Sequence, residues 1–274
     1  MFSIIHKQYL QGCTLLLLQM LLLFFAVCVQ ASVAQPHWQK DDYLIESFID
    51  ISLRREYRAN KKTNLHRWQQ PLKIFIKSEV GDPLLQRQMY RVQAKHLQSI
   101  TGHAIHVVNS QQEANVLVVF TSAKRMKSNA FKYTITTSDL EQVLKSAICM
   151  ASIESNKQSE IIRGVILIPV DSTRQSGRLV DCIIEELTQV MGLPNDSTAV
   201  YPSIFNDLSI DSYLTGLDYL LLKIAYHPLL KPGMSEAQVR EKLPAILLEL
   251  REQGEIENAQ WRVLDKSMKK WLGQ

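Results

Sequence analysis

Four short apolar runs between residues 71 and 170 most constrain the fold of this 274-residue chain. Each run alternates apolar with polar residues or is rich in β-branched side chains, which is typical of strands buried on one or both faces. Such strands must pair into a sheet, and helices must cover the apolar faces of that sheet. The runs are residues 71–77, 103–109, 114–120 and 161–170.

Helices are expected between and after these runs. Asp82 and Pro83 form a helix start, and Gly102 supplies the stop. A second helix over residues 178–191 follows the last run, after a loop of Ser, Thr and Gly. Phe131 to Ile135 is expected to form an edge strand. The chain is therefore predicted to be α+β, with a mixed twisted sheet, two main helices and a helical C-terminal subdomain.

Residues 1–34 have the order of a secretory signal peptide. Lys7 is the only charged residue, an apolar run spans 14–29, and small residues end the segment at 31–34 (ASVA). Cleavage after either alanine gives a periplasmic or secreted protein. The alternative is an uncleaved inner-membrane anchor at residues 14–34, which approach the roughly 20 residues that cross a bilayer.

The remainder is expected to comprise an N-terminal helix and linker (35–64), a main domain (65–234) and a helical C-terminal extension (235–274). The first helix starts at Asp41 and runs to about Arg58. Loss of the signal segment lowers the net charge from +4 to +3. This near balance, without a long basic run, argues against nucleic acid as a partner.

The C-terminal extension opens at Ser235, which forms a capping box with Gln238. Apolar side chains then recur at helical spacing and are expected to dock on the domain itself, or else to lie on a membrane or a partner. They are Trp261, Leu264, Met268, Trp271 and Leu272.

Two cysteines lie outside the signal segment, Cys149 and Cys182, 33 residues apart. An even pair in an exported chain predicts a disulfide. Loop-closure entropy would make such a bond worth about 3–4 kcal/mol. Two buried free thiols are the alternative, chiefly if the chain is not exported.

The helix over residues 178–191 is amphipathic at 100° per residue. Its apolar stripe includes Ile183, Ile184 and Leu187, and Gly192 ends the helix. Composition alone fits a surface helix with its polar face in water. That polar face holds Asp181, Cys182, Glu185, Glu186 and Gln189.

Residues 185–196 (EELTQVMGLPND) nevertheless have the spacing of the metzincin pattern H-E-x-x-H-x-x-G-x-x-H. Glu186 and Gly192 match this pattern, and residues 199–203 (AVYPS) stand where the methionine turn would lie. The segment therefore resembles a metzincin zinc-binding helix with its ligands replaced, which implies a zincin-like fold. The three histidine positions hold Glu185, Gln189 and Asn195.

At closer range, roughly residues 65–245 resemble an exported bacterial family known as domain of unknown function 2927. The resemblance implies a fold but almost nothing about activity. Three separated motifs carry it: Cys182-x-x-Glu185-Glu186-x-x-Gln189-x-x-Gly192-Leu193-x-Asn195-Asp196, Ser203-Ile204-Phe205-Asn206-Asp207 and Leu230-x-Pro232-Gly233-Met234.

Zinc catalysis needs neutral imidazole ligands, and none of the seven histidines stands at a motif position. Oxygen donors suit a hard divalent cation better than zinc, and we expect no cofactor. Glu186, in the general-base position, is the candidate catalytic residue. Glu185, Gln189, Asn195 and Asp196 are the candidate binding residues. They would form either the acidic floor of a cleft for a peptide, glycan or amine, or a structural clamp.

These patterns predict an exported, non-catalytic binding or scaffold module of the cell envelope, with a peptide, glycan or envelope protein as its partner. One alternative is a hydrolase of peptide or peptidoglycan that uses Glu186 with a non-standard metal. Another is a structural component of an envelope assembly that makes its contact through the C-terminal helical part.

Overall fold

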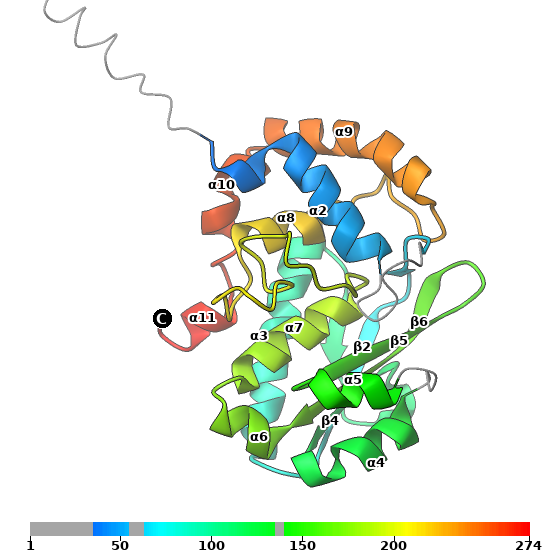
Figure 1. Ribbon diagram of the computed structural model, residues 1–274, viewed down its shortest axis with the longest axis vertical. Helices are drawn as coiled ribbons and strands as arrows, with labels where there is room; N and C mark the ends of the chain where they lie inside the picture. Colours follow the sequence, from blue (N-terminus) through cyan, green and yellow to red (C-terminus); the bar gives the residue numbers. More distant parts are fainter. Residues whose placement is uncertain (1–34, 55–62, 135–139) are drawn as a thin grey trace, which may run out of the picture. The chain divides into compact units, whose positions relative to one another are not determined.

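The computed structural model describes residues 35–54, 63–134 and 140–274 (Figure 1). The expectations for the signal segment lie outside these ranges. Residues 37–274 form a compact unit, and every described core residue lies at or after Leu44. None of the helices in the described ranges is long and apolar enough to cross a bilayer.

A six-stranded, mostly parallel sheet forms the centre of this unit. The strand order is β1-β6-β4-β2-β3, and β5 pairs with β6 in the antiparallel direction. All four apolar runs are confirmed as strands, so the fold is a mixed α/β fold with a helical C-terminal part. The strands are β1 (Arg67–Trp68), β2 (Leu72–Ser78), β3 (Ile105–Val107), β4 (Val116–Thr121), β5 (Met150–Ser155) and β6 (Glu160–Pro169).

Helices cover both faces of the sheet (Figure 1). On one face, α3 (Pro83–Thr101) and α7 (Leu179–Val190) bury the main apolar core. On the other face, α4 (Ala123–Tyr133) and α5 (Leu140–Ser146) close a smaller second core. The alternation along each strand explains the two cores, because successive side chains point to opposite faces. In β4, for example, Val118 belongs to the main core and Val119 to the second.

The predicted edge strand at Phe131 to Ile135 is wrong as far as Tyr133, because these residues end α4. Met126, Asn129 and Ala130 are its buried side chains, spaced as in a helix. The antiparallel edge strand is instead β5. The segment expected as a loop after β6 contains a short helix, α6 (Val170–Gln175).

The N-terminal helix α2 (Asp41–Leu53) packs against two C-terminal helices, α8 (Gly216–Ala225) and α9 (Glu236–Glu252). Its start at Asp41 is confirmed, but it ends at Leu53, and the rest of the expected helix and linker lies largely outside the described residues. The Arg240 guanidinium donates to Glu46 on α2 at 2.7 Å. The other helices are η1 (His37–Gln39), η2 (Gln111–Glu113), α10 (Glu255–Arg262) and α11 (Met268–Trp271).

The capping box at Ser235 and Gln238 is confirmed at the start of α9. Docking of the C-terminal side chains is confirmed for Met268, which is buried, but not for Trp261, which is 74% exposed. Side chains from all three expected ranges join one apolar core, and the proposed boundaries between those ranges stay predictions.

Candidate functional site

Helix α7 carries most of the residues that the sequence singled out. Its apolar stripe packs into the main core as expected, with Ile183 and Leu187 fully buried. The opposite side is not the solvated face that composition suggested, since Cys182 is 1% and Glu186 is 4% exposed. The correction has a long-range cause, because β5 packs against α7 and segment 204–212 lies over its outer side.

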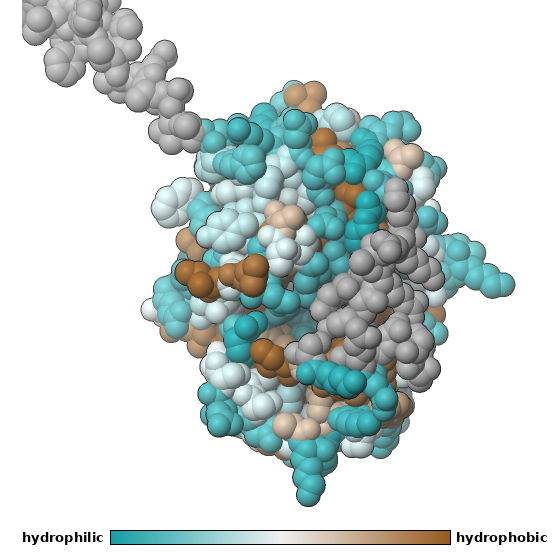
Figure 2. Space-filling view, in the orientation of Figure 1, coloured by the Kyte–Doolittle hydropathy of each residue, from teal (hydrophilic) through white to brown (hydrophobic). Residues whose placement is uncertain are grey.

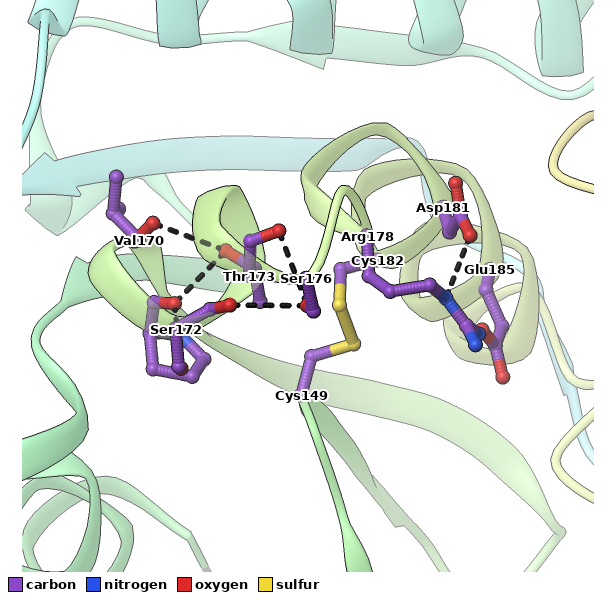
Figure 3. Close-up of a disulfide and its surroundings, with 10 residues drawn as sticks. Cys149, Val170, Ser172, Thr173, Ser176, Arg178, Asp181, Cys182 and Glu185 are labelled. Carbon is purple, nitrogen blue, oxygen red and sulfur yellow. Dashed lines mark hydrogen bonds and ion pairs between the residues drawn. A yellow bond between two sulfur atoms is a disulfide. The ribbon is translucent and has the colours of Figure 1, made fainter.

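A disulfide joins Cys182 on α7 to Cys149, directly before β5 (Figure 3). The predicted pairing is therefore confirmed. The bond attaches the antiparallel edge strand to the polar side of α7. Figure 3 also shows Arg178 beside the disulfide, with its guanidinium extending towards Asp181 and Glu185.

Arg178 organises the exposed part of this polar side. Its Nε lies 2.6 Å from Asp181 Oδ2, and its Nη2 lies 4.0 Å from Glu185 Oε2. Asp207 and Asp211, from the segment after α7, line the same pocket, which has a cavity volume of about 170 Å³. The pocket is thus lined by four carboxylates and one guanidinium, so these groups carry a net charge of −3. The pocket is built to attract positive charge.

Two exposed apolar side chains, Leu208 and Ile210, lie in the segment that lines the pocket, and Ile210 itself lines the cavity. Both belong to the irregular segment before α8. The surface in Figure 2 is mainly hydrophilic, with separate hydrophobic patches. A cationic group entering the pocket would therefore meet apolar contacts at its edge.

Three carboxylates converge beside this pocket. One oxygen each from Glu185, Asp196 and Asp207 lies within 4.8 Å of the others. Gln189 Nε2 donates to Asp196 Oδ1 at 3.0 Å, so the amide orients one member of the group. The structure thus brings together three of the four predicted binding residues, Glu185, Gln189 and Asp196.

Asn195, the fourth predicted binding residue, faces α2 instead. Its side-chain nitrogen donates to the backbone oxygen of Asp50 at 3.0 Å, and its backbone nitrogen to that of Ile51 at 3.2 Å. Asn195 therefore fastens the exit of α7 to the end of α2. The sequence left two roles open for these residues, the floor of a cleft or a structural clamp. The contacts of Asn195 fit the structural clamp.

Glu186, the candidate catalytic residue, does not line the acidic pocket. It is buried near Tyr90 of α3, where burial and then the Glu186 charge raise the pKa of the Tyr90 hydroxyl well above its usual value. Glu185 and Glu186 therefore lie in different environments, although they are adjacent in the sequence.

Residues 199–203, which follow the end of α7, are held by contacts from α2 and from α8. Tyr43 of α2 accepts a hydrogen bond from Tyr201 N at 2.7 Å, and its hydroxyl lies 3.1 Å from Ala199 O. Ser203 donates to Asp218 Oδ1 at 2.5 Å, within the buried capping box of α8. Ser203 is thus part of the scaffold, whereas Asp207 joins the carboxylate group.

Glu185, Gln189 and Asn195 stand at the spacing of the metzincin ligand positions, but their side chains do not converge on one point. Asn195 faces α2, and the Gln189 amide nitrogen donates to Asp196. No histidine of the described ranges belongs to the converging group. Carboxylate oxygens are instead the ligands that calcium and magnesium prefer, usually with several more oxygens or waters.

Sequence reasoning missed Arg178 and Asp211. Arg178 precedes Asp181 by three residues and Glu185 by seven, which is a usable signal for one helix face. Asp211 lies in an irregular segment, whose path over α7 has no local sequence signal. The sequence carried no reason to place Asp211 near Glu185.

Fold and site together define a disulfide-bonded α/β domain with an acidic pocket on one helix. Residues 41–245 match the family described as Protein of unknown function (DUF2927), and the chain belongs to that family. The match extends further towards the N-terminus than the motifs indicated, and it includes α2. A search of curated proteins finds no match.

Proposed function

We propose that the protein is an exported, non-catalytic binding module of the cell envelope whose acidic pocket holds a positively charged group of its ligand. The observation that carries this proposal is that four carboxylates, Asp181, Glu185, Asp207 and Asp211, line one pocket together with a single cation, Arg178. The cavity of about 170 Å³ is smaller than the roughly 300 Å³ at which drug-sized sites begin, so it suits one amine-bearing side chain. An amine of a peptide or of peptidoglycan has this chemistry.

We also propose that the scaffold derives from a metzincin-like domain. Supporting observations are the succession β2, α3, β3, β4, β5, β6 and α7, interrupted by α4 and α5 before β5 and by the short α6 before α7, and the position of Glu185 at the start of the motif on α7. The binding site would then occupy the surface around the positions that hold zinc ligands in metzincins, and it would bind a cationic group instead of a metal. Residues 1–34 would direct export to the periplasm or the medium.

The test is calorimetric titration of the oxidised protein with a muropeptide that carries a free side-chain amine. The matched ligand is the same muropeptide with that amine acetylated. We expect binding of the first alone, and a loss of about tenfold or more in the double variant Glu185→Gln, Asp207→Asn, since a charge-assisted contact contributes roughly 1.5–3 kcal/mol. Glu241→Gln, an exposed carboxylate on α9, is the control. Equal affinity for both ligands, or no affinity for either, would refute the proposal.

The hydrolase alternative receives support from one observation, the converging oxygens of Glu185, Asp196 and Asp207, which offer ligands to a hard cation. Against it stands the burial of Glu186 near Tyr90. Metal analysis and a muropeptide-cleavage assay of wild type and Glu186→Gln separate the two. If the wild type cleaves the muropeptide and Glu186→Gln does not, the protein is a hydrolase and the proposal of a non-catalytic binding module is refuted.

The assembly alternative is supported by the exposure of Trp261 on α10. Truncation before α10 would be uninformative, because Ile256 and Ala259 of the same helix are buried. Trp261→Ala removes the exposed ring alone. An assembly role predicts that this variant loses a co-purifying envelope protein while its unfolding midpoint stays unchanged, and retention of that protein counts against the role.

A further inference from the structure

The exposed side of α4 is a second charged surface, on the other face of the sheet from α7. Met126, Asn129 and Ala130 face the protein interior. The helix contains no acidic residue. Apart from Ala123 and Ser128, its exposed side chains are basic or aromatic: Lys124, Arg125, Lys127, Phe131 and Lys132.

Two strands add cations at the C-terminal end of this helix, around Tyr133. Lys77 of β2 donates to the Tyr133 hydroxyl at 2.7 Å, and Arg163 of β6 donates to its backbone oxygen at 3.1 Å. The Lys132 ammonium lies 5.1 Å from the centroid of the same ring. Three elements thus bring cations together at one place, and the contacts to Tyr133 hold them there.

These six cations, which we name the α4 cationic face, are Lys77, Lys124, Arg125, Lys127, Lys132 and Arg163. Four described carboxylates lie among them. Glu79 pairs with Lys77 at 3.0 Å, Glu141 pairs with Lys127 at 3.0 Å, and Glu154 stands opposite Arg163 in the β5–β6 ladder. The fourth is Asp171, whose Oδ1 accepts from Ala123 N at the start of α4 at 2.8 Å. Six cations against four carboxylates leave a net charge of +2, whereas the pocket on α7 is acidic.

Phe131 supplies the apolar component of this surface. Its side chain is 48% exposed, and the Lys127 ammonium lies 5.8 Å from its ring centroid. A basic helix that presents an aromatic ring to solvent is typical of segments that lie on anionic lipid. There the lysine stems reach the headgroups while the ring enters the boundary of the acyl chains.

We propose that the α4 cationic face docks the domain on an anionic phospholipid surface, with Phe131 inserted among the headgroups. The occupant is chosen by charge complementarity, because a bilayer offers the dense anionic charge and the apolar boundary that these two components match. The acidic pocket is built on the other face of the sheet, so docking leaves it open to solvent. This inference is independent of the ligand proposed for that pocket.

The test uses residues 35–274, which hold the whole described core and lack the apolar run at 14–29 that would itself insert into lipid. Sedimentation with phosphatidylglycerol–phosphatidylcholine vesicles should show binding that falls with salt, and pure phosphatidylcholine vesicles should show little. The double variant Lys124→Glu, Lys132→Glu should bind at least about 25-fold more weakly, since each basic side chain near an anionic surface contributes about fivefold. Phe131→Ala should weaken the binding that remains at high salt.

The matched control is Lys95→Glu, Lys231→Glu, which makes the same charge change at two exposed lysines outside α4. It should retain wild-type binding to within about twofold, since distant charges are screened beyond about 10 Å. Equal loss in both double variants would overturn the proposal in favour of a net-charge effect. Full competition by inorganic phosphate would assign the face to a soluble anion instead. Unchanged unfolding midpoints establish that each variant is folded.

Discussion

Replacing Asp218 with asparagine tests how this fold tolerates a buried carboxylate. Asp218 Oδ2 accepts hydrogen bonds from Thr215 N at 2.8 Å, Thr215 Oγ1 at 2.9 Å and Ile204 N at 3.2 Å, and Oδ1 accepts from Ser203 at 2.5 Å. Burial nevertheless raises the pKa of Asp218 from 3.8 to about 6. The folded state therefore binds the proton more tightly than the unfolded state does.

The sign of the pH dependence follows from this difference. The stability that the group contributes is fully present below pH 3.8 and is lost as the pH rises through about 6. A shift of about two pKa units corresponds to about 3 kcal/mol, of which about 2 kcal/mol is lost between about pH 4 and pH 7. Asp218→Asn cannot titrate. Its oxygen can still serve Thr215 and Ile204, while the Ser203 hydroxyl can turn to accept from its amide.

Urea unfolding of wild type and Asp218→Asn at both pH values measures the effect, because titration of all other groups is common to the two proteins. The stability of the wild type relative to the variant should fall by about 2 kcal/mol between about pH 4 and pH 7. Asp265→Asn, an exposed carboxylate, should follow the wild type. A difference that stays constant, or that rises with pH, would show that hydrogen bonding outweighs burial at Asp218, and the reasoning would be refuted.

Three further changes test the contacts around α7, each by urea unfolding. Cys149→Ser with Cys182→Ser should cost about 3–4 kcal/mol from loop-closure entropy, and unchanged stability would contradict a structural role for the bond. Asn195→Ala should cost about 1–2 kcal/mol by removing the bond to Asp50 O, whereas exposed Asn64→Ala should cost little. Tyr43→Phe should cost about 1–2 kcal/mol, because Tyr201 N loses its acceptor; a neutral result would mean that water replaces it.

Elements marked by a local sequence signal, such as a helix cap or a continuous apolar run, were predicted correctly. Helix α3 begins and ends where Asp82 and Gly102 indicate, with the Asp82 side chain accepting from Leu84 N at 2.8 Å and Gly102 at a φ of 69°. Strand β6 is apolar for most of its length and was equally clear. At α4, the alternation of Phe131, Tyr133 and Ile135 imitates a strand, and only the burial of Met126 and Ala130 reveals the helix.

The site was less predictable, because its composition depends on what covers α7. A helical wheel places Glu186 and Cys182 on the polar side, but it contains no information about β5 packing over that side. The direction of the Asn195 side chain depends in the same way on α2, about 145 residues earlier in the chain. Spacing within the motif located the relevant helix, and only the tertiary structure separates Glu185 from Glu186.

The packing of α2 against α8 and α9 has a consequence for the order of assembly. Glu46 meets its partner Arg240 only after 194 further residues have been made. At about 5–20 residues per second, the apolar face of this helix remains uncovered for about 10–40 s of synthesis. Of the described α-helices, α2 is therefore the first to be synthesised and among the last to complete its packing. During synthesis its apolar face stays exposed until the partner helices that cover it have been made.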